Sequence, residues 1–454
     1  MKKKFFYSSA ILVTTIFLLI SIFFNFTTSS FKASNVKKTI SLLASDDYEG
    51  RLSGSSGNIL AENYISDIFS KSSVIPINET YKEEFTAIAP FKTDEESFLK
   101  VFTSGGSLIH NFKYGIDFKE DLINFRNTSF NFSKDWAESS NNQIINIYTR
   151  SIEVIDNGKT LLFYIPTDNN FDFRSSFLSD LVYDMLVLIT TETYNKMIAY
   201  LRDNSAISVN IPYENRETTM NNIVGFVEGK DITLPPLVLT AHFDHLGVDG
   251  DNNLYGGALD NASGTAFLLE LMRSYSSYSK PERSIIFATL NAEEFGLLGS
   301  KSFADKNFEL IKNSEVINFD MIGSTGYPIT LMVGKSFSNK NSDLLNSIEN
   351  LAKKKNIETR VVYEDSSDHA SFNNLGIDSL SFCHSDLTKI HTPNDKVEFI
   401  SLSAIDDAYK LIEDKINENY NPVYLFLINR HSVILFSLIL ILLAINKGKF
   451  QKTS

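Results

Sequence analysis

The chain of 454 residues is poor in cysteine and in positive charge: it has 1 cysteine, 7 histidines and a formal net charge of −13. The lone Cys383 cannot form a disulfide within the chain, and its apolar surroundings predict a buried, inert thiol. No thiolate cluster is available for a structural zinc site. The acidic balance, without any basic stripe, argues against nucleic-acid binding. With 43% hydrophobic and 21% charged residues, the composition is that of a globular protein with room for more than one domain.

Both ends of the chain are apolar. Lys2, Lys3 and Lys4 precede an uncharged stretch from Phe5 to Phe24. At about 1.5 Å per residue, a helix of this length spans about 30 Å, which is the thickness of the hydrocarbon core of a membrane. The residues that follow make a poor cleavage site, so we expect an uncleaved anchor, with a cleaved signal peptide as the alternative.

A second apolar segment extends from Val423 to Ile445 and is interrupted by the polar triplet 429–431. If Arg430 extends toward the membrane surface, this segment can also cross the bilayer; the alternative is a helix that lies in the interface. Basic residues follow it, namely Lys447, Lys449 and Lys452. Because basic residues that flank a span stay in the cytoplasm, we expect both ends of the chain on the cytoplasmic side of the cell membrane. The region between them is then expected on the extracytoplasmic side.

Between these ends, short apolar runs finish on or just before histidines and carboxylates. The runs LVLTAH, SIIFATLNAEE and VINFDMIG have the composition of buried strands. Because sites in α/β sheets collect beyond the carboxyl ends of strands, residues far apart in sequence can meet there. The candidate metal ligands and acids are His242, Asp260, Glu293, Glu294, Asp320 and His391.

These residue types suit zinc at a catalytic site, since they offer imidazole nitrogen and carboxylate oxygen without thiolate. Two zinc ions about 3.5–4 Å apart need a shared anion to offset their repulsion. Asp260, Glu294 and Asp320 supply three negative charges, and one shared hydroxide supplies the fourth. Glu293 is then free to take a proton from the shared water. The residue types therefore predict two Zn²⁺ per chain at a site that activates water.

The ordered set resembles the double-zinc aminopeptidase and glutamate carboxypeptidase family of metallopeptidases, clan MH. That family's pattern is found here as His242 with Asp244, Asp260 with Asn261, Glu293 with Glu294, Asp320, and a final His391. Two further segments also match, from Leu43 to Asn58 and from Ser367 to Phe372, and the resemblance covers residues 38–90 and 216–415. Each motif alone also has a structural explanation. The His-x-Asp motif can be a surface pair, the two glutamates can lie on a solvated helix face, and DNASG can form a turn with a helix N-cap.

The resemblance implies a role for each residue. It assigns His242 and Asp320 to one zinc, Glu294 and His391 to the other, Asp260 to the bridge between them, and Glu293 and Asp244 to catalysis. Glu293 would be the general base, and Asp244 would orient a histidine ligand. The resemblance also implies a cis peptide bond between Asp260 and Asn261.

One position departs from the family, because Ile390 stands where many relatives have a tyrosine that helps polarise the scissile carbonyl. That role is therefore open. His245 and His369 lie inside matching segments but at no ligand position of the family. For His369, a place in the substrate pocket and a structural hydrogen bond are the two alternatives.

The sequence also predicts the domain organisation. We expect an α/β fold in three layers, α/β/α, around a central mixed sheet. Between residues 91 and 215 the composition shifts to short β-like runs with turn signals, which predicts an inserted β-rich domain similar to protease-associated domains. The predicted segments are an N-terminal anchor (1–30), the first part of the peptidase (31–90), the insert (91–215), the main zinc peptidase part (216–420) and a C-terminal transmembrane segment with its tail (421–454).

These features predict a membrane-anchored, extracytoplasmic, zinc-dependent exopeptidase that acts on peptides. An aminopeptidase that hydrolyses N-terminal residues is our first hypothesis. A carboxypeptidase with the same metals is the second, although no cationic group for a substrate carboxylate can be identified from the sequence. A non-catalytic, receptor-like ectodomain is the third, and the complete set of ligands argues against it. The sequence does not indicate the oligomeric state.

Overall fold

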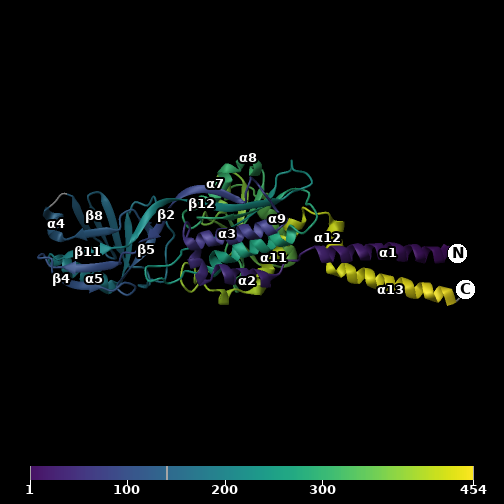
Figure 1. Ribbon diagram of the computed structural model, residues 1–454, viewed down its shortest axis with the longest axis horizontal. Coiled ribbons are helices and arrows are strands. Elements are labelled where there is room, and N and C mark those ends of the chain that lie inside the picture. Colours follow the sequence, from purple (N-terminus) through teal and green to yellow (C-terminus); the bar gives the residue numbers. More distant parts are fainter. Residues whose placement is uncertain (1, 140–141, 453–454) are drawn as a thin grey trace.

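The computed structural model describes residues 2–139 and 142–452 of the chain. The molecule is elongated (Figure 1). A β-rich region built from strands between β2 and β12 lies at one end, a sheet covered by helices lies in the middle, and two terminal helices project from the other end. Both chain termini lie near the far tip of those two helices.

The middle region is built on a mixed sheet of nine strands in the order β1-β12-β14-β13-β15-β18-β16-β17, with β2 paired to β12. Strands β14, β13, β15 and β18 are neighbours and run parallel to one another, whereas β12 and β16 run antiparallel to their partners in this group. The strands are β1 (Ile75–Pro76), β2 (Lys82–Lys92), β12 (Tyr213–Val227), β13 (Leu237–His242), β14 (Ile285–Leu290), β15 (Glu315–Phe319), β16 (Ile329–Val333), β17 (Thr359–Tyr363) and β18 (Asp378–His384).

Helices cover both faces of this sheet, which confirms the predicted α/β fold with a central mixed sheet. One face carries α2 (Ala33–Leu43), α3 (Ser56–Lys71), α6 (Gly264–Tyr275), α9 (Asp343–Lys355) and α11 (Leu402–Asn417). The other carries α7 (Leu298–Lys306), α8 (Phe308–Ile311) and α10 (His369–Asn374). Short helical turns connect these elements, namely η1 (Asp46–Arg51), η2 (Ala258–Ser263), η3 (Lys335–Phe337) and η4 (Val397–Phe399).

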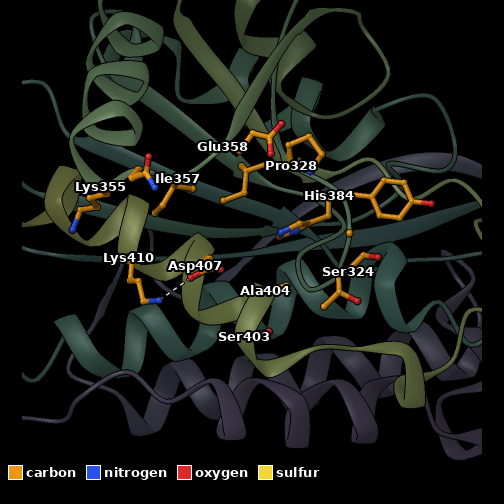
Figure 2. Close-up of a pocket in the computed structure, with 15 residues that line it drawn as sticks. Ser324, Pro328, Lys355, Ile357, Glu358, His384, Ser403, Ala404, Asp407 and Lys410 are labelled. Carbon is orange, nitrogen blue, oxygen red and sulfur yellow. Dashed lines mark hydrogen bonds and ion pairs between the residues drawn. The ribbon is translucent and has the colours of Figure 1, made fainter.

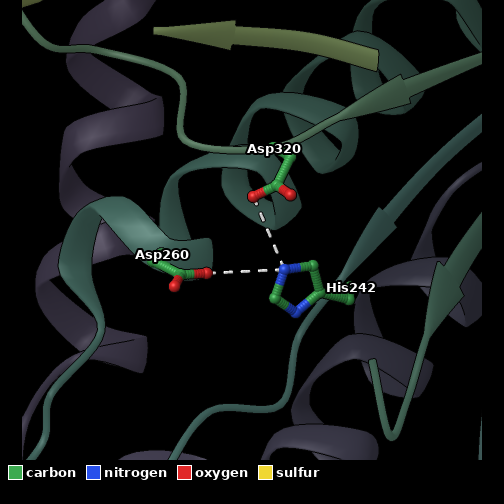
Figure 3. Close-up of side chains that lie close together, drawn as sticks. All are labelled: His242, Asp260 and Asp320. Atoms are coloured by element: carbon green, nitrogen blue, oxygen red, sulfur yellow. Dashed lines mark ion pairs between the residues drawn. The ribbon is translucent and has the colours of Figure 1, made fainter. Parts of the chain in front are cut away.

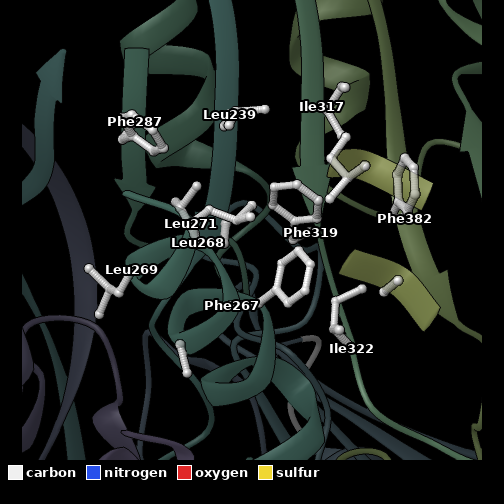
Figure 4. Packing of buried hydrophobic residues seen from close by; sticks show 14 of the residues in the cluster. Leu239, Phe267, Leu268, Leu269, Leu271, Phe287, Ile317, Phe319, Ile322 and Phe382 are labelled. Carbon is white, nitrogen blue, oxygen red and sulfur yellow. The ribbon is translucent and has the colours of Figure 1, made fainter. Parts of the chain in front are cut away.

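Helix α6 is apolar on almost every side because the sheet covers one side and α2 the other. Figure 4 shows its side chains packed against those of the parallel strands, with the rings of Phe267 and Phe319 4.9 Å apart. Each such buried side chain contributes about 1.5–3 kcal/mol through loss of apolar surface from water. At the start of α6, a Cβ on Gly264 would lie 2.1 Å from the carbonyl oxygen of Phe319. Glycine there lets the helix approach the end of β15.

The β-rich region forms two further sheets, in the orders β5-β10-β9-β8-β7 and β4-β3-β11-β6. The long antiparallel pair β2 and β12 belongs to the central sheet and leads the chain into this region and out again (Figure 1). Three short β-like runs of the insert correspond to strands: NQIINIYT contains β7, TLLFYIP contains all but the first residue of β9, and DMLVLIT contains β10. The elements are β3 (Phe98–Phe102), β4 (Leu108–Phe112), β5 (Phe118–Phe125), β6 (Ser129–Phe132), α4 (Lys134–Ser139), β7 (Gln143–Ile147), β8 (Ser151–Asp156), β9 (Lys159–Tyr164), β10 (Met185–Ile189), α5 (Thr191–Arg202) and β11 (Ala206–Asn210).

The terminal helices α1 (Lys2–Thr27) and α13 (Arg430–Lys452) pack side by side (Figure 1). The rings of Phe17 and Phe436 stack at 5.6 Å, and the hydroxyls of Ser21 and Ser432 lie 3.2 Å apart. By length and composition, Phe5–Thr27 and Arg430–Lys447 can each cross a membrane.

The C-terminal apolar segment forms two helices. The run from Val423 to Ile445 is not one helix, because it divides at Asn429 into α12 (Pro422–Ile428) and α13. The extended backbone of Asn429 ends α12, and its side-chain oxygen accepts the N–H of His431 at the start of α13. The polar triplet therefore acts as a helix boundary.

Candidate metal centre

The candidate ligands lie at the carboxyl ends of the parallel strands. His242 is the last residue of β13, Glu293 and Glu294 follow β14, and Asp320 directly follows β15. His391 lies on the loop after β18. Because these four strands are parallel neighbours, their ends meet at one edge of the sheet, and residues far apart in sequence meet there.

A first group consists of His242, Asp260 and Asp320, all of them buried (Figure 3). The Nε2 atom of His242 lies 3.5 Å from Asp260 Oδ1 and 3.5 Å from Asp320 Oδ1. The other oxygen of Asp320 accepts the hydroxyl of Ser367 at 2.7 Å. Asp320 Oδ1 has no hydrogen-bond partner within the described part of the chain. Three donor atoms of the right kinds therefore converge on one small volume.

A second group lies on the other side of Asp260. Asp260 Oδ2 lies 3.3 Å from His391 Nε2, and Glu294 Oε1 lies 3.2 Å from the same nitrogen. Glu294 Oε1 also lies 3.1 Å from His245 Nδ1. Asp260 thus directs one carboxylate oxygen toward each group, which is the arrangement a shared ligand needs. His245 is an addition to the expected set: it lies three residues after His242, but spacing alone gave it no role.

The shared Asp260 is held by Asp395, a residue that sequence reasoning missed. The carboxylate of Asp395 accepts the backbone N–H of Leu259 at 2.8 Å and that of Asp260 at 3.0 Å. The peptide bond between Asp260 and Asn261 is cis, as the resemblance implied. Asp395 lies four residues after His391 in KIHTPND, so the loop that carries the last histidine also fixes the shared carboxylate.

Asp244 connects the first histidine with the pair of glutamates. Its Oδ1 lies 3.6 Å from Nδ1 of His242, on the side of the ring away from the group. Its two oxygens also accept the backbone N–H groups of Glu293 at 3.1 Å and Glu294 at 3.2 Å. The hydroxyl of Ser53 donates to it at 3.0 Å. This buried carboxylate therefore lies against the ring of one candidate ligand and fixes the chain direction at Glu293 and Glu294.

The electrostatics show an excess of buried negative charge. Burial raises the pKa of Glu293 well above its ordinary value, and nearby carboxylates add to this effect. Burial lowers the pKa of His391, but the carboxylates of Glu294 and Asp260 outweigh it and raise that pKa to about 11. His242 shows the same balance, with a pKa held well above the ordinary value. Surroundings of this kind attract positive charge, which a bound dication supplies.

These residues fit zinc. The donors are imidazole nitrogens and carboxylate oxygens, the types zinc takes at catalytic sites. Among the described residues, the buried Asp320 Oδ1 has no hydrogen-bond partner, and Asp260 has an oxygen for each group. His242, Asp260 and Asp320 would hold one ion. Asp260 and Glu294 would hold a second, with His391 or His245 as the imidazole donor.

Both groups open into a cleft of about 650 Å³. Its wall is largely apolar and includes Leu178, Leu297, Met332, Val362, Leu387 and Ile390. Glu293 lines it, together with the acids Glu364 and Asp365 and one cation, Arg360. Ile390 itself lines the cleft, so no tyrosine hydroxyl reaches the cleft from that position.

The other histidines of the matched region have structural roles. His369 contacts the hydroxyl of Ser381 at 2.8 Å and the carbonyl oxygen of Glu364 at 2.9 Å, which favours the structural alternative. His384 accepts the N–H of Gly323 at 3.2 Å, and burial lowers its pKa to about 4.

His384 also lines a separate cavity of about 740 Å³ (Figure 2). The two lysines of this cavity are already paired, Lys410 with Asp407 at 2.7 Å and Lys355 with Asp414 at 3.1 Å. None of the metal-type groups found among the described residues lies there. The cleft that holds Glu293 is therefore the place for chemistry.

Comparison with known proteins agrees with this geometry. Residues 222–415 match the model of peptidase family M28. Aminopeptidase YwaD of Bacillus subtilis (strain 168) is 32% identical over 210 residues, which cover 44% of this chain and 45% of that protein. A vacuolar membrane protease of Kluyveromyces lactis is 42% identical over 105 residues, which cover 23% of this chain and 10% of that protein. The chain therefore matches less than half the length of either relative.

Two solved structures share the fold over most of the chain. The aminopeptidase from Aneurinibacillus sp. strain AM-1 has a TM-score of 0.58 at 21% identity, and the match covers 86% of this chain and 95% of that one. The zinc aminopeptidase BSAP from Bacillus subtilis has a TM-score of 0.57 at 20% identity, with the same coverage. The region that matches peptidase family M28, residues 222–415, carries every candidate ligand.

Proposed function

We propose that the protein is a membrane-anchored, zinc-dependent aminopeptidase whose peptidase region faces the extracytoplasmic side. The observation that carries the proposal is the carboxylate of Asp260, which is shared between two buried groups of zinc-type donors, with Glu293 beside them in the cleft. The similarity to aminopeptidase YwaD supports the same reaction.

The chain's own residues provide proton transfer and positioning. Zinc, when bound, supplies Lewis-acid activation of the scissile carbonyl and of the attacking water. Glu293 takes a proton from that water, and burial raises the pKa of its carboxyl well above the ordinary value, which makes the carboxylate a stronger base. Glu293 then passes the proton to the leaving amine. Asp244 holds the ring of His242 in place throughout.

The charge of the cleft favours a substrate with a free amino terminus. Glu364 and Asp365 lie along the cleft with Glu293, and carboxylates attract an α-ammonium group. The apolar wall suits an apolar first side chain. One observation favours the second candidate, a carboxypeptidase: the exposed Arg360 lines the same cleft and provides the cation that a substrate carboxylate would need.

The two terminal helices support anchoring. Both are long and apolar enough to cross a bilayer, and they pack against each other. The similarity to vacuolar membrane proteases agrees with membrane association. The lysines at both ends support a cytoplasmic position for the termini.

A panel of chromogenic substrates tests the reaction. Aminoacyl substrates, the same substrates with a blocked amine, and substrates with a free C-terminal carboxylate are compared before and after treatment with a chelator. We expect hydrolysis of the free-amine substrates only, abolished by the chelator and restored by zinc, with metal analysis showing up to two ions per chain. Full activity in metal-free protein would refute the proposal.

The variant Arg360→Ala separates the two candidates. An aminopeptidase should keep its activity, because Arg360 would not contact the substrate amine. Cleavage of C-terminal residues, lost in this variant, would establish the carboxypeptidase instead.

A further inference from the structure

A short segment of the β-rich region, residues 173–178, reaches the metal centre. It follows β9 and precedes β10 in the chain, so it belongs to the region inserted between β2 and β12. The hydroxyl of Ser176 donates to Glu294 Oε2 at 2.5 Å. The ring of Phe173 stacks on that of His391, with centroids 5.3 Å apart. Leu178 lines the cleft. The inserted region therefore contacts two candidate ligands of the second group.

The hydrogen bond from Ser176 distinguishes the two oxygens of Glu294. Oε2 accepts the hydroxyl, while Oε1 faces His391 at 3.2 Å and His245 at 3.1 Å. A carboxylate has two equivalent oxygens and rotates about its terminal bond unless one of them is held. Ser176 thus fixes the orientation in which Oε1 points toward the second group.

The backbone of the segment holds the same two ligands. The N–H of Phe177 donates to the carbonyl oxygen of Glu294 at 2.9 Å, and the N–H of Arg174 donates to that of His391 at 2.9 Å. Glu294 follows β14 and His391 follows β18, so the segment connects two separate loops. No contact of this kind reaches the first group from the segment among the described residues.

The segment is itself anchored in the β-rich region through β5. The guanidinium of Arg174, 1% exposed, lies 3.7 Å from Glu120 and 3.3 Å from the hydroxyl of Tyr213. Both the N–H and the hydroxyl of Ser175 donate to Asp121, at 3.1 Å and 2.9 Å. Buried contacts of this kind restrict movement, so the contacts with β5 determine where Ser176 lies.

We propose that Ser176 is a positioning residue for the second metal subsite. The inserted region completes this subsite by holding the side chains of Glu294 and His391 in a fixed position relative to each other. The inference rests on the proposed function in that it takes zinc as the ion. Ligands held by outer hydrogen bonds typically lose about 10–100-fold in metal affinity when that bond is removed. The first subsite, built from His242, Asp260 and Asp320, does not depend on the segment.

The test is a metal titration of the full chain in detergent or nanodiscs, which does not rely on activity. Metal-free protein is titrated with Zn²⁺ against a competing chelator, and with Co²⁺ by its visible absorption. We expect Ser176→Ala to weaken one of two binding steps by about 10–100-fold and to leave the other unchanged. Ser176→Thr keeps the hydroxyl and should restore the weakened step.

Ser179→Ala is the matched control, since it removes a hydroxyl three residues along that makes no hydrogen bond with any of the described residues, where only the Ser179 carbonyl oxygen accepts. It should bind both ions as the wild type does. Wild-type binding in Ser176→Ala would overturn the inference, and so would equal weakening of both steps together with a lower melting temperature, because that indicates a general structural role. A wild-type chain that binds two ions but hydrolyses no substrate would refute the proposed function alone.

Discussion

Glu293 and Glu294 are neighbours in the chain, but their surroundings differ. Glu294 is buried, and both of its oxygens have partners: His391 and His245 on one side and Ser176 on the other. Burial raises its pKa, but the two histidines outweigh this and hold it well below the ordinary value. Glu293 faces the cleft instead, with a raised pKa. One acid is therefore suited to bind a cation and the other to exchange a proton.

This difference predicts the outcome of Glu293→Gln. The variant keeps the size of the side chain but cannot take a proton, so we expect turnover to fall by about 10²–10⁴-fold while metal content stays that of the wild type. Metal analysis and steady-state kinetics on the same preparation measure both. Glu309→Gln on α8, which changes an exposed acid far from the cleft, serves as the control. Near-wild-type turnover in Glu293→Gln would show that another group is the base.

At the scale of elements, one buried cation connects the loops that carry ligands. The guanidinium of Arg51, at the end of η1, donates to the carbonyl oxygens of Leu43 at 2.6 Å and Phe243 at 2.7 Å. It also donates to those of Gly256 at 2.8 Å and Gly257 at 2.9 Å. These oxygens belong to the end of α2, the residue after β13 and the turn that leads to Asp260. Burial lowers the pKa of Arg51 to about 10, and it stays charged at neutral pH.

We therefore expect Arg51→Met to lower the free energy of unfolding by about 3 kcal/mol or more, because each buried acceptor left without a donor costs about 1–3 kcal/mol. Urea denaturation with an unchanged m-value would measure this loss. Arg216→Met, which changes an exposed arginine on β12, should shift the midpoint little. A wild-type midpoint for Arg51→Met would mean that these three segments are held together by other contacts.

The elements also show what sequence can and cannot predict here. The strands before His242, Glu293 and Asp320 were predictable because each is a continuous apolar run, and parallel strands deliver their ends to one edge. The part played by Asp395 was not, since its contact with the turn at Asp260 joins two loops without any periodic pattern. The same holds for Ser176, whose partner Glu294 lies in another part of the fold.

At the scale of the whole molecule, the β-rich region and the terminal helices lie at opposite ends (Figure 1). The polar residue Asn429 divides the C-terminal apolar run, so α13 alone has the length of a span. Helix α12 packs near the end of α1 through Tyr424 and Phe24, whose rings lie 5.2 Å apart. An antiparallel pair formed by α1 and α13 would direct both termini to the same side of a membrane and the peptidase region to the other.

This arrangement predicts the outcome of protease treatment of intact protoplasts. If both helices cross the membrane, residues from about 30 to 420 are accessible, while a tag placed after Ser454 and a cytosolic marker protein are protected, because basic residues flanking spans remain in the cytoplasm. Lysed protoplasts provide the control in which the tag and the marker are also digested.

Protection of the peptidase region together with the marker would place the region inside the cell. Digestion of the tag along with the peptidase region would show that α13 lies on the outer surface, and the enzyme would then be anchored by α1 alone. If the peptidase region is exposed in either way, the substrates of the proposed aminopeptidase would be peptides outside the cell.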